Sequence, residues 1–185
     1  MMIFLLRNLI YRELNELQKN MKELPIEDYC YFQSPIGLIR ISENKGFLTR
    51  TDFVENKPES EYFLSVSATS TLLNEACSQL DEYFHGIRQK FNLPLKPKGT
   101  FFQRSAWNSL LHIPFGETRT YLQQAESINN PNATRAIGQA NSRNPISIII
   151  PCHRVIRKNG FISGYSGGTE RKMRLISMEG RFMHG

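Results

Sequence analysis

Residues 120–140 read TYLQQAESINNPNATRAIGQA and predict two short helices joined by a tight turn. Thr120 and Gln123 have the spacing of a capping box, which predicts the start of the first helix. Asn132 follows a proline and is the predicted N-cap of a second helix over residues 133–140. Helices with this spacing are typical of a helix-turn-helix unit, in which the second helix lies against DNA, although many helical hairpins share the pattern.

The segments on either side of this pair extend it into a helical domain. Upstream, a third helix is predicted over residues 101–113, because apolar side chains fall on one face: Phe102, Ala106, Leu110 and Ile113. Downstream, residues 146–150 are Ile-Ser-Ile-Ile-Ile, which predicts a short buried strand.

The first half of the chain has the texture of a small α/β domain. Strands are predicted on either side of the turns Ser34-Pro-Ile-Gly37 and Asn44-Lys-Gly46, followed by a helix over residues 70–84. The Pro-rich residues 92–99 predict a linker. We therefore divide the chain into three parts: an N-terminal helical extension (residues 1–27), an α/β domain (28–97) and a helical domain (98–185).

Apolar residues repeat at helical spacing in the extension: Ile10, Leu14, Leu17, Met21 and Leu24. Such a stripe predicts a helix that covers the flank of a domain. The segment has no small-residue cleavage site and is too short to span a bilayer, so we expect no membrane association. An alternative is that translation starts at Met21, and the sequence leaves both interpretations open.

The composition is that of an ordinary folded protein, because 40% of the residues are hydrophobic and 22% are charged. It excludes disordered, collagen-like and disulfide-rich secreted proteins. The three cysteines, Cys30, Cys77 and Cys152, have no paired spacing, which favours a reducing, cytoplasmic compartment. Cys77 lies on the border of its predicted helix, where packing explains it. Cysteine and histidine show no zinc spacing, so we expect no metal.

Charge is divided unequally along the chain. Residues 1–97 contain 11 Lys and Arg against 13 Asp and Glu, whereas residues 98–185 contain 12 against 4, a net charge of +8. A basic helical half joined to a slightly acidic half suggests that only the second half meets a polyanion such as nucleic acid. The alternative is a solvated basic face without a partner.

The residues that can perform chemistry follow the predicted strand, in Pro151-Cys-His-Arg-Val-Ile156. A lone buried cysteine usually serves packing, but Cys152 has His153 beside it, and Arg154 and Arg157 nearby are expected to favour the thiolate. Glu179 is the better placed of the downstream acids to complete a Cys–His–Glu relay.

These residues carry a resemblance. Pro151-Cys-His-Arg-Val-Ile156, with Asn144-Pro145 before it and Gly164-Tyr-Ser-Gly-Gly168 and Glu179-Gly180 after it, resembles the methylated-DNA–protein-cysteine methyltransferases, also called O6-alkylguanine-DNA alkyltransferases. The likeness runs from about Tyr29 to Gly180 and includes the Ser-Pro-Ile-Gly turn of the first domain. Several separate motifs in the right order make it specific.

The resemblance implies a fold of two classes, α/β and mainly α. A small ribonuclease-H-like α/β domain would precede a winged helix-turn-helix domain. It also implies irreversible transfer of the alkyl group from O6-alkylguanine, and from O4-alkylthymine, in double-stranded DNA to Cys152. The nucleotide would be flipped out of the duplex, each chain would react once, and the protein would be a monomer without a cofactor.

The resemblance assigns a role to each residue of the relay. Cys152 would be the alkyl acceptor, His153 would be the base acting through a water, and Glu179 would orient His153. Asn144 would be the hinge between the second helix of the helix-turn-helix and the cysteine segment, and Tyr121 the phenol that supports the departing guanine.

Arg135 would fill the base stack after the nucleotide leaves, and the alternative for this residue is a phosphate contact. Tyr165, Ser166 and the backbone around Gly167 would shape the base pocket. Further contacts with substrate or DNA are expected from five positions: Thr134, Ala136, Gly138, Asn141 and Val155.

Three other functions fit parts of the sequence. A lesion-binding protein that transfers nothing would lack the acceptor cysteine, which is present here. A cysteine hydrolase would use Cys152, His153 and Glu179 but leaves the basic helical domain unexplained. A helix-turn-helix regulator would be expected to add a metal-binding cysteine cluster, which the sequence lacks.

Overall fold

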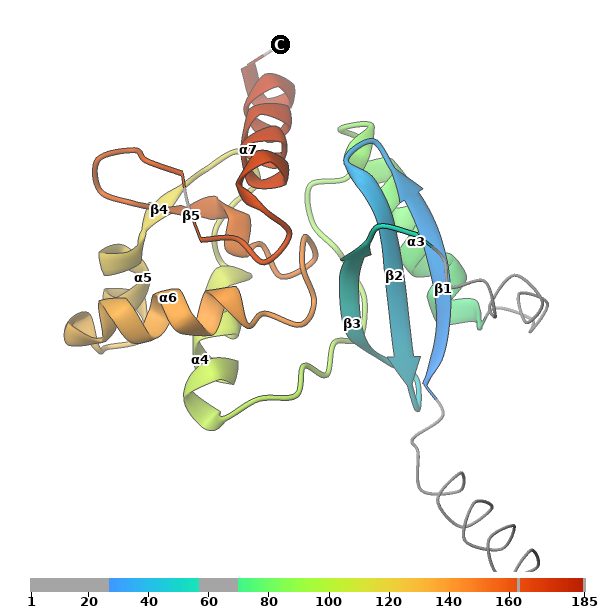
Figure 1. Ribbon diagram of the computed structural model, residues 1–185, viewed down its shortest axis with the longest axis horizontal. Helices are drawn as coiled ribbons and strands as arrows, with labels where there is room; N and C mark the ends of the chain where they lie inside the picture. Colours follow the sequence, from blue (N-terminus) through green and yellow to red (C-terminus); the bar gives the residue numbers. More distant parts are fainter. Residues whose placement is uncertain (1–26, 57–69, 163, 185) are drawn as a thin grey trace, which may run out of the picture.

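A computed structural model describes residues 27–56, 70–162 and 164–184 of the 185-residue chain. It consists of a three-stranded sheet with one helix and, beside it, a unit of helices and short strands (Figure 1). The predicted extension over residues 1–27 lies outside the described residues except for Glu27. None of the described helices is long and apolar enough to cross a bilayer.

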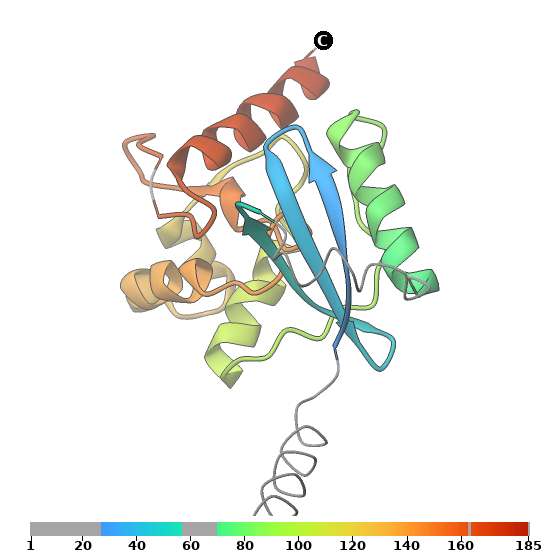
Figure 2. The same cartoon turned by 45° about the vertical axis from the view of Figure 1, so that its right-hand side comes forward.

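The sheet forms as the turn motifs predict. Its antiparallel strands are β1 (Asp28–Ser34), β2 (Gly37–Asn44) and β3 (Phe47–Val54), in the order β1-β2-β3. Helix α3 (Thr71–Phe84) follows, and the Ser70 hydroxyl caps it by accepting a hydrogen bond from the Leu73 amide at 3.1 Å. β3 is the strand nearest to the helical unit (Figures 1 and 2).

The helical unit contains the predicted helix-turn-helix. In chain order its elements are α4 (Phe101–Leu110), β4 (Arg119–Thr120), α5 (Tyr121–Ser127), the 3-10 turn η1 (Pro131–Ala133), α6 (Thr134–Ser142), the 3-10 turn η2 (Cys152–Arg154), β5 (Val155–Ile156) and α7 (Thr169–His184). The two-residue strands β4 and β5 pair in parallel. The capping box of Thr120 and Gln123 opens α5 as predicted.

Two local predictions in this unit are wrong. Asn132 does not cap α6, because it lies inside η1 and the helix begins at Thr134 without a side-chain cap. Residues 146–150 form no regular strand. Instead, the chain reverses there, with Ile148 at a φ of 72° and the Ile150 amide donating to the Ile146 carbonyl at 3.0 Å. Five buried residues in a row resemble a strand in sequence, but here burial comes from packing between the two units.

α5 and α6 are held together by a pair of buried amides. The Asn141 side chain donates to Gln124 Oε1 at 2.7 Å, and Gln124 donates back to Asn141 Oδ1 at 3.3 Å and to the Ala106 carbonyl at 3.0 Å. Trp107 adds a bond from its ring nitrogen to the Ala140 carbonyl at 2.8 Å. This packing leaves the opposite face of α6, with Arg135 among its residues, exposed.

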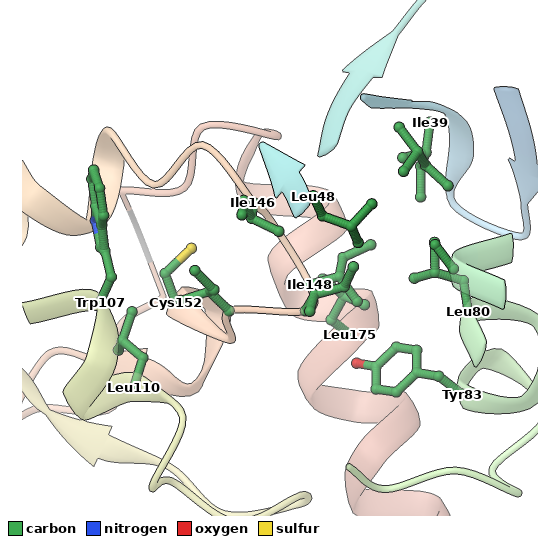
Figure 3. Close-up of a cluster of buried hydrophobic side chains, with 14 of the residues drawn as sticks. Ile39, Leu48, Leu80, Tyr83, Trp107, Leu110, Ile146, Ile148, Cys152 and Leu175 are labelled. Carbon is green, nitrogen blue, oxygen red and sulfur yellow. The ribbon is translucent and has the colours of Figure 1, made fainter. Parts of the chain in front are cut away.

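The two units share one hydrophobic core. Ile39, Leu48 and Tyr83 of the first unit and Leu110, Ile148, Leu175 and others of the second belong to a single buried cluster (Figure 3). The predicted linker lies along β3, where Leu48 exchanges hydrogen bonds with the Pro94 carbonyl and the Lys96 amide. The division of the chain at residue 97 stays a prediction.

Candidate active site

The site is centred on Cys152, which begins η2 and is only 3% exposed. Asn144 holds it there. Its Nδ2 donates to the Cys152 sulfur at 3.2 Å and to the Ile150 carbonyl at 2.8 Å, while its Oδ1 accepts from the Ile146 amide at 3.1 Å. One amide side chain therefore joins the reversed segment to the sulfur, while the role of Asn144 as a hinge stays a prediction.

His153, the next residue, is fully buried and bonded to Glu179. Its Nε2 lies 2.9 Å from Glu179 Oε1. A carboxylate only accepts hydrogen bonds, so Nε2 carries the proton and Nδ1 keeps its lone pair. Nδ1 is buried without a hydrogen-bond partner among the described residues. Burial lowers the pKa of His153 against the opposing effect of Glu179, so the ring is neutral at neutral pH and has the form of a base.

Besides His153, Glu179 receives hydrogen bonds from Arg154 of η2 and from two other segments of the chain. Arg154 approaches it through Nε and Nη2, each at 3.0 Å, and the Gly116 amide donates at 3.1 Å. Tyr83 on α3 donates its hydroxyl at 2.7 Å. Burial by itself would raise the pKa of Glu179, but the bonds and charges of His153 and Arg154 outweigh it and hold the pKa well below its ordinary value. The carboxylate stays ionised and fixes the His153 ring.

The prediction that neighbouring arginines favour the thiolate is wrong. Arg154 is directed to Glu179 and to the Ile113 carbonyl, 2.7 Å from its Nη1. Burial raises the pKa of Cys152, against the lowering effects of the Asn144 hydrogen bond and the charge of Lys172. The resting group is therefore a thiol, and it needs a base before it can act as a nucleophile.

Lys172 is the residue that sequence reasoning missed. It is completely buried on α7, and its Nζ donates to the Val155 carbonyl at 2.6 Å. Its charge is the one that lowers the pKa of Cys152. A signal existed in the spacing, because Lys172, Leu175 and Glu179 occupy positions i, i+3 and i+7 and so share one face of the helix.

Tyr121 and Tyr165 lie close enough to Cys152 for a charge on its sulfur to affect both phenols. Tyr121 is half-buried at the start of α5, with its ring centroid 5.9 Å from Lys172 Nζ. Burial raises the pKa of both phenols, and a thiolate at Cys152 would add to the effect. Gly167 has no room for a side chain, because a Cβ there would lie 2.7 Å from the rings of Phe53 and Tyr165. Ser166, between Tyr165 and Gly167 in the chain, is exposed.

The other positions expected to contact DNA or substrate are spread over α6 and β5. Arg135 and Ala136 are exposed on α6, and Thr134 and Gly138 are half-buried. Asn141, however, is 3% exposed and engaged with Gln124, so the structure uses it to join α5 and α6 and does not present it to DNA. Val155 is buried and contributes its carbonyl to Lys172. Contacts with DNA at these positions stay predictions.

The part of the chain that the structure describes contains no group of three His, Cys, Asp or Glu residues arranged to hold a metal ion. Fold and site together define a class: a two-domain protein with a helix-turn-helix unit and a buried thiol beside a His–Glu pair. Residues 28–97 match the family description "6-O-methylguanine DNA methyltransferase, ribonuclease-like domain". Residues 101–181 match "6-O-methylguanine DNA methyltransferase, DNA binding domain".

Individual relatives agree with this assignment. The chain is 45% identical to the methylated-DNA–protein-cysteine methyltransferase of Methanosarcina acetivorans, over 82% of this chain and 97% of the relative. The crystal structure of the O6-methylguanine methyltransferase of Mycobacterium tuberculosis superposes with a TM-score of 0.74 at 38% identity, covering 84% of this chain and 94% of that one. A structure of the same mycobacterial protein in complex with DNA gives 0.73 at 38% identity, covering 83% and 93%.

The chain belongs to the 6-O-methylguanine DNA methyltransferase family. The predicted fold class, a ribonuclease-like α/β domain followed by a helical DNA-binding domain, is confirmed, as is the resemblance noted in the sequence.

Proposed function

We propose that the protein repairs alkylated DNA by moving the alkyl group from O6 of guanine to the sulfur of Cys152. As a member of its family it is a methylated-DNA–protein-cysteine methyltransferase. The observation that carries the choice of atom is the buried Cys152 thiol, bonded to Asn144 and followed in the chain by a neutral His153 with a free Nδ1 lone pair. DNA is the partner of the domain that contains Cys152.

In this mechanism His153 Nδ1 removes the thiol proton through a bridging water. The imidazolium that forms is stabilised by the Glu179 carboxylate at 2.9 Å. The resulting thiolate keeps the Asn144 hydrogen bond and the nearby charge of Lys172. Because burial raises the pKa of Cys152, the equilibrium favours the thiol until reaction with substrate consumes the thiolate.

The thiolate attacks the alkyl carbon, so a carbon–sulfur bond forms while the bond from carbon to guanine O6 breaks. The electron pair of the broken bond remains on the guanine, which takes a proton from the Tyr121 hydroxyl. The product is a thioether without a hydrolysable bond, and no residue beside Cys152 offers a way to cleave it. Each chain therefore acts once.

Access to a sulfur that is 3% exposed requires the nucleotide to leave the duplex. Extrusion of a nucleotide costs a few kcal/mol. Arg135 is exposed on α6, and in this proposal its planar guanidinium occupies the vacated stack. If so, Arg135→Ala slows repair of duplex DNA much more than reaction with free O6-methylguanine base. Equal losses with both substrates would assign Arg135 to a phosphate contact instead.

The test of the reaction is intact mass before and after incubation with an O6-methylguanine oligonucleotide, followed by peptide mapping. We expect a gain of about 14 Da, one methyl group per chain, on the acceptor sulfur. Cys152→Ala should gain nothing, while the matched variant Cys77→Ala should react as the unaltered protein does. Tight lesion binding without a mass gain would indicate a binding protein, and neither binding nor gain would reopen the hydrolase alternative.

Binding to the phosphate backbone is part of the same proposal, supported by the net charge of +8 on residues 98–185. Affinity should fall steeply with salt concentration, and a flat dependence would count against it. O4-alkylthymine as a second substrate, a monomeric state and a cytoplasmic location complete the proposal. The three cysteines are free thiols, which supports a reducing compartment.

A further inference from the structure

Two cysteines outside the active site lie in direct contact. The sulfur atoms of Cys30 on β1 and Cys77 on α3 are 3.4 Å apart, although 47 positions separate them in sequence. Sequence reasoning assigned Cys77 to packing alone, because no spacing in the chain connects it to Cys30. The contact arises from the way the helix lies on the sheet.

The packing of α3 on β1 determines this contact. Cys30 and Phe32 alternate along β1 onto one face, and the Phe32 ring stacks on Phe84 of α3 at 6.2 Å between centroids. On α3, Cys77 follows the buried Ala76 and precedes the buried Leu80 by less than one turn. Both cysteines are half-buried, so the sulfurs are held in place by the core and remain within reach of a small reagent.

We propose that Cys30 and Cys77 form a reversible disulfide by exchange with a small-molecule disulfide such as oxidised glutathione, and so constitute a redox site separate from the alkyl acceptor. The disulfide would join β1 to α3 within the first unit. It is a covalent modification of the protein that leaves the Cys152 sulfur untouched.

The chemistry proceeds in two exchanges. The Cys77 thiolate attacks one sulfur of oxidised glutathione, which forms a mixed disulfide and releases one glutathione thiolate. Cys30 then loses its proton to solvent and attacks the Cys77 sulfur, which releases the second glutathione. Two protein thiols have lost two electrons and two protons, and one glutathione disulfide has become two thiols.

The two thiols differ in pKa, as this order of the two exchanges requires. The hydrogen bond from Cys30 lowers the pKa of Cys77, which favours it as the first nucleophile. The same bond raises the pKa of Cys30, together with burial and the charges of Cys77 and Glu43. Once Cys77 is a mixed disulfide it carries no charge, so the largest cause that holds the proton on Cys30 is gone.

The crosslink should also stabilise the fold. It closes a long loop between residues that already touch, which restricts the unfolded chain more than the folded one. α3 also carries Tyr83, whose hydroxyl is bonded to Glu179. Fixing α3 to the sheet therefore supports the helix that contributes to the active site, while Cys152, at 3% exposure, is shielded from the oxidant.

The test treats the full chain with oxidised glutathione, blocks the remaining thiols with iodoacetamide, and maps peptides without reduction. We expect a peptide pair linked through Cys30 and Cys77, a loss of about 2 Da before blocking, and reversal by dithiothreitol. The oxidised protein should melt several degrees higher than the reduced one and still accept a methyl group from an O6-methylguanine oligonucleotide.

Two serine variants separate this site from general oxidation. Cys30→Ser and Cys77→Ser should each stop at a single glutathione adduct on the cysteine that remains, and neither should show the rise in melting temperature. Both should transfer methyl groups at the unaltered rate. Independent glutathione adducts on both cysteines, a crosslink to Cys152, an inert pair, or a crosslinked protein that melts lower than the reduced one would each overturn the proposal.

Discussion

The Glu179→Gln variant tests the site most directly, because one carboxylate fixes both the base and a buried guanidinium. Arg154 Nη2 lies 3.0 Å from the carboxylate, and the Arg154 side chain is only 7% exposed. Charges at this separation attract by about 5.5 kcal/mol at an effective dielectric constant near 20. Removing one member of a buried pair costs about 3–5 kcal/mol, because the other charge stays buried without compensation.

That loss is a large part of the total stability of a folded domain, which is about 5–15 kcal/mol. In a urea titration followed by circular dichroism, the midpoint of Glu179→Gln should fall by about 2 M. The matched control is Glu170→Gln on the same helix, since Glu170 is 74% exposed and pairs with Arg174 at 2.9 Å. The control should change stability by less than about 1 kcal/mol.

Methyl transfer by Glu179→Gln should be slower by about two to four orders of magnitude, the usual contribution of a general base. The glutamine amide no longer requires the proton of His153 to reside on Nε2, so Nδ1 becomes protonated and cannot accept the proton of Cys152. The rate is measured by quenched mass spectrometry with an O6-methylguanine oligonucleotide, at a temperature where the variant is folded. A variant with an unaltered urea midpoint and an unaltered transfer rate would refute this account of the carboxylate.

Three further outcomes follow from the same contacts. The pKa of Glu179 is depressed in the folded state, so its contribution to stability is present above the ordinary glutamate pKa and is lost as pH falls through the folded-state pKa. The urea midpoints of the unaltered protein and of Glu179→Gln should therefore converge in acid. A constant difference between the two midpoints would contradict the ion pair. Tyr83→Phe should lose about 1.5–3 kcal/mol of unfolding free energy, which is the usual contribution of a hydrogen bond to a charged group. A loss below about 0.5 kcal/mol in the same urea titration would show that this hydrogen bond is dispensable. Lys172→Met should shift the pH–rate profile of Cys152 with iodoacetamide to higher pH, while an unshifted profile would mean that the lysine charge does not reach the sulfur.

The features predicted correctly from sequence are those that depend on neighbours in the chain. The capping box at Thr120 involves residues three apart, and the turn at Ser34-Pro-Ile-Gly37 closes on itself through a bond from the Ser34 hydroxyl to the Gly37 carbonyl. The order of the motifs around Cys152 is also visible in the sequence, and it indicated the contact between His153 and Glu179 that the structure contains. Local chemistry of this kind does not require knowledge of how distant segments meet.

The features that sequence reasoning missed depend on contacts between distant segments. Tyr83 reaches Glu179 across 96 positions, and Cys30 reaches Cys77 across 47. Arg154 was assigned to the thiol because it is close in sequence, whereas the fold directs it to Glu179. Lys172 is buried with its Nζ bonded to the Val155 carbonyl, whereas a lysine on an amphipathic helix predicts solvent exposure.

The burial of Cys152 has a consequence for the molecule after it has reacted. Cys152 is part of the core and is 3% exposed, so an added methyl group enters a buried region. Overfilling a packed interior costs about 1–3 kcal/mol, and the methyl group has to be accommodated beside the Asn144 amide that contacts the sulfur. If Cys152 is the acceptor as proposed, a methylated chain should unfold more easily than an unmethylated one. Since proteases in a cell act on the unfolded fraction, methylated chains should be degraded before unmethylated ones.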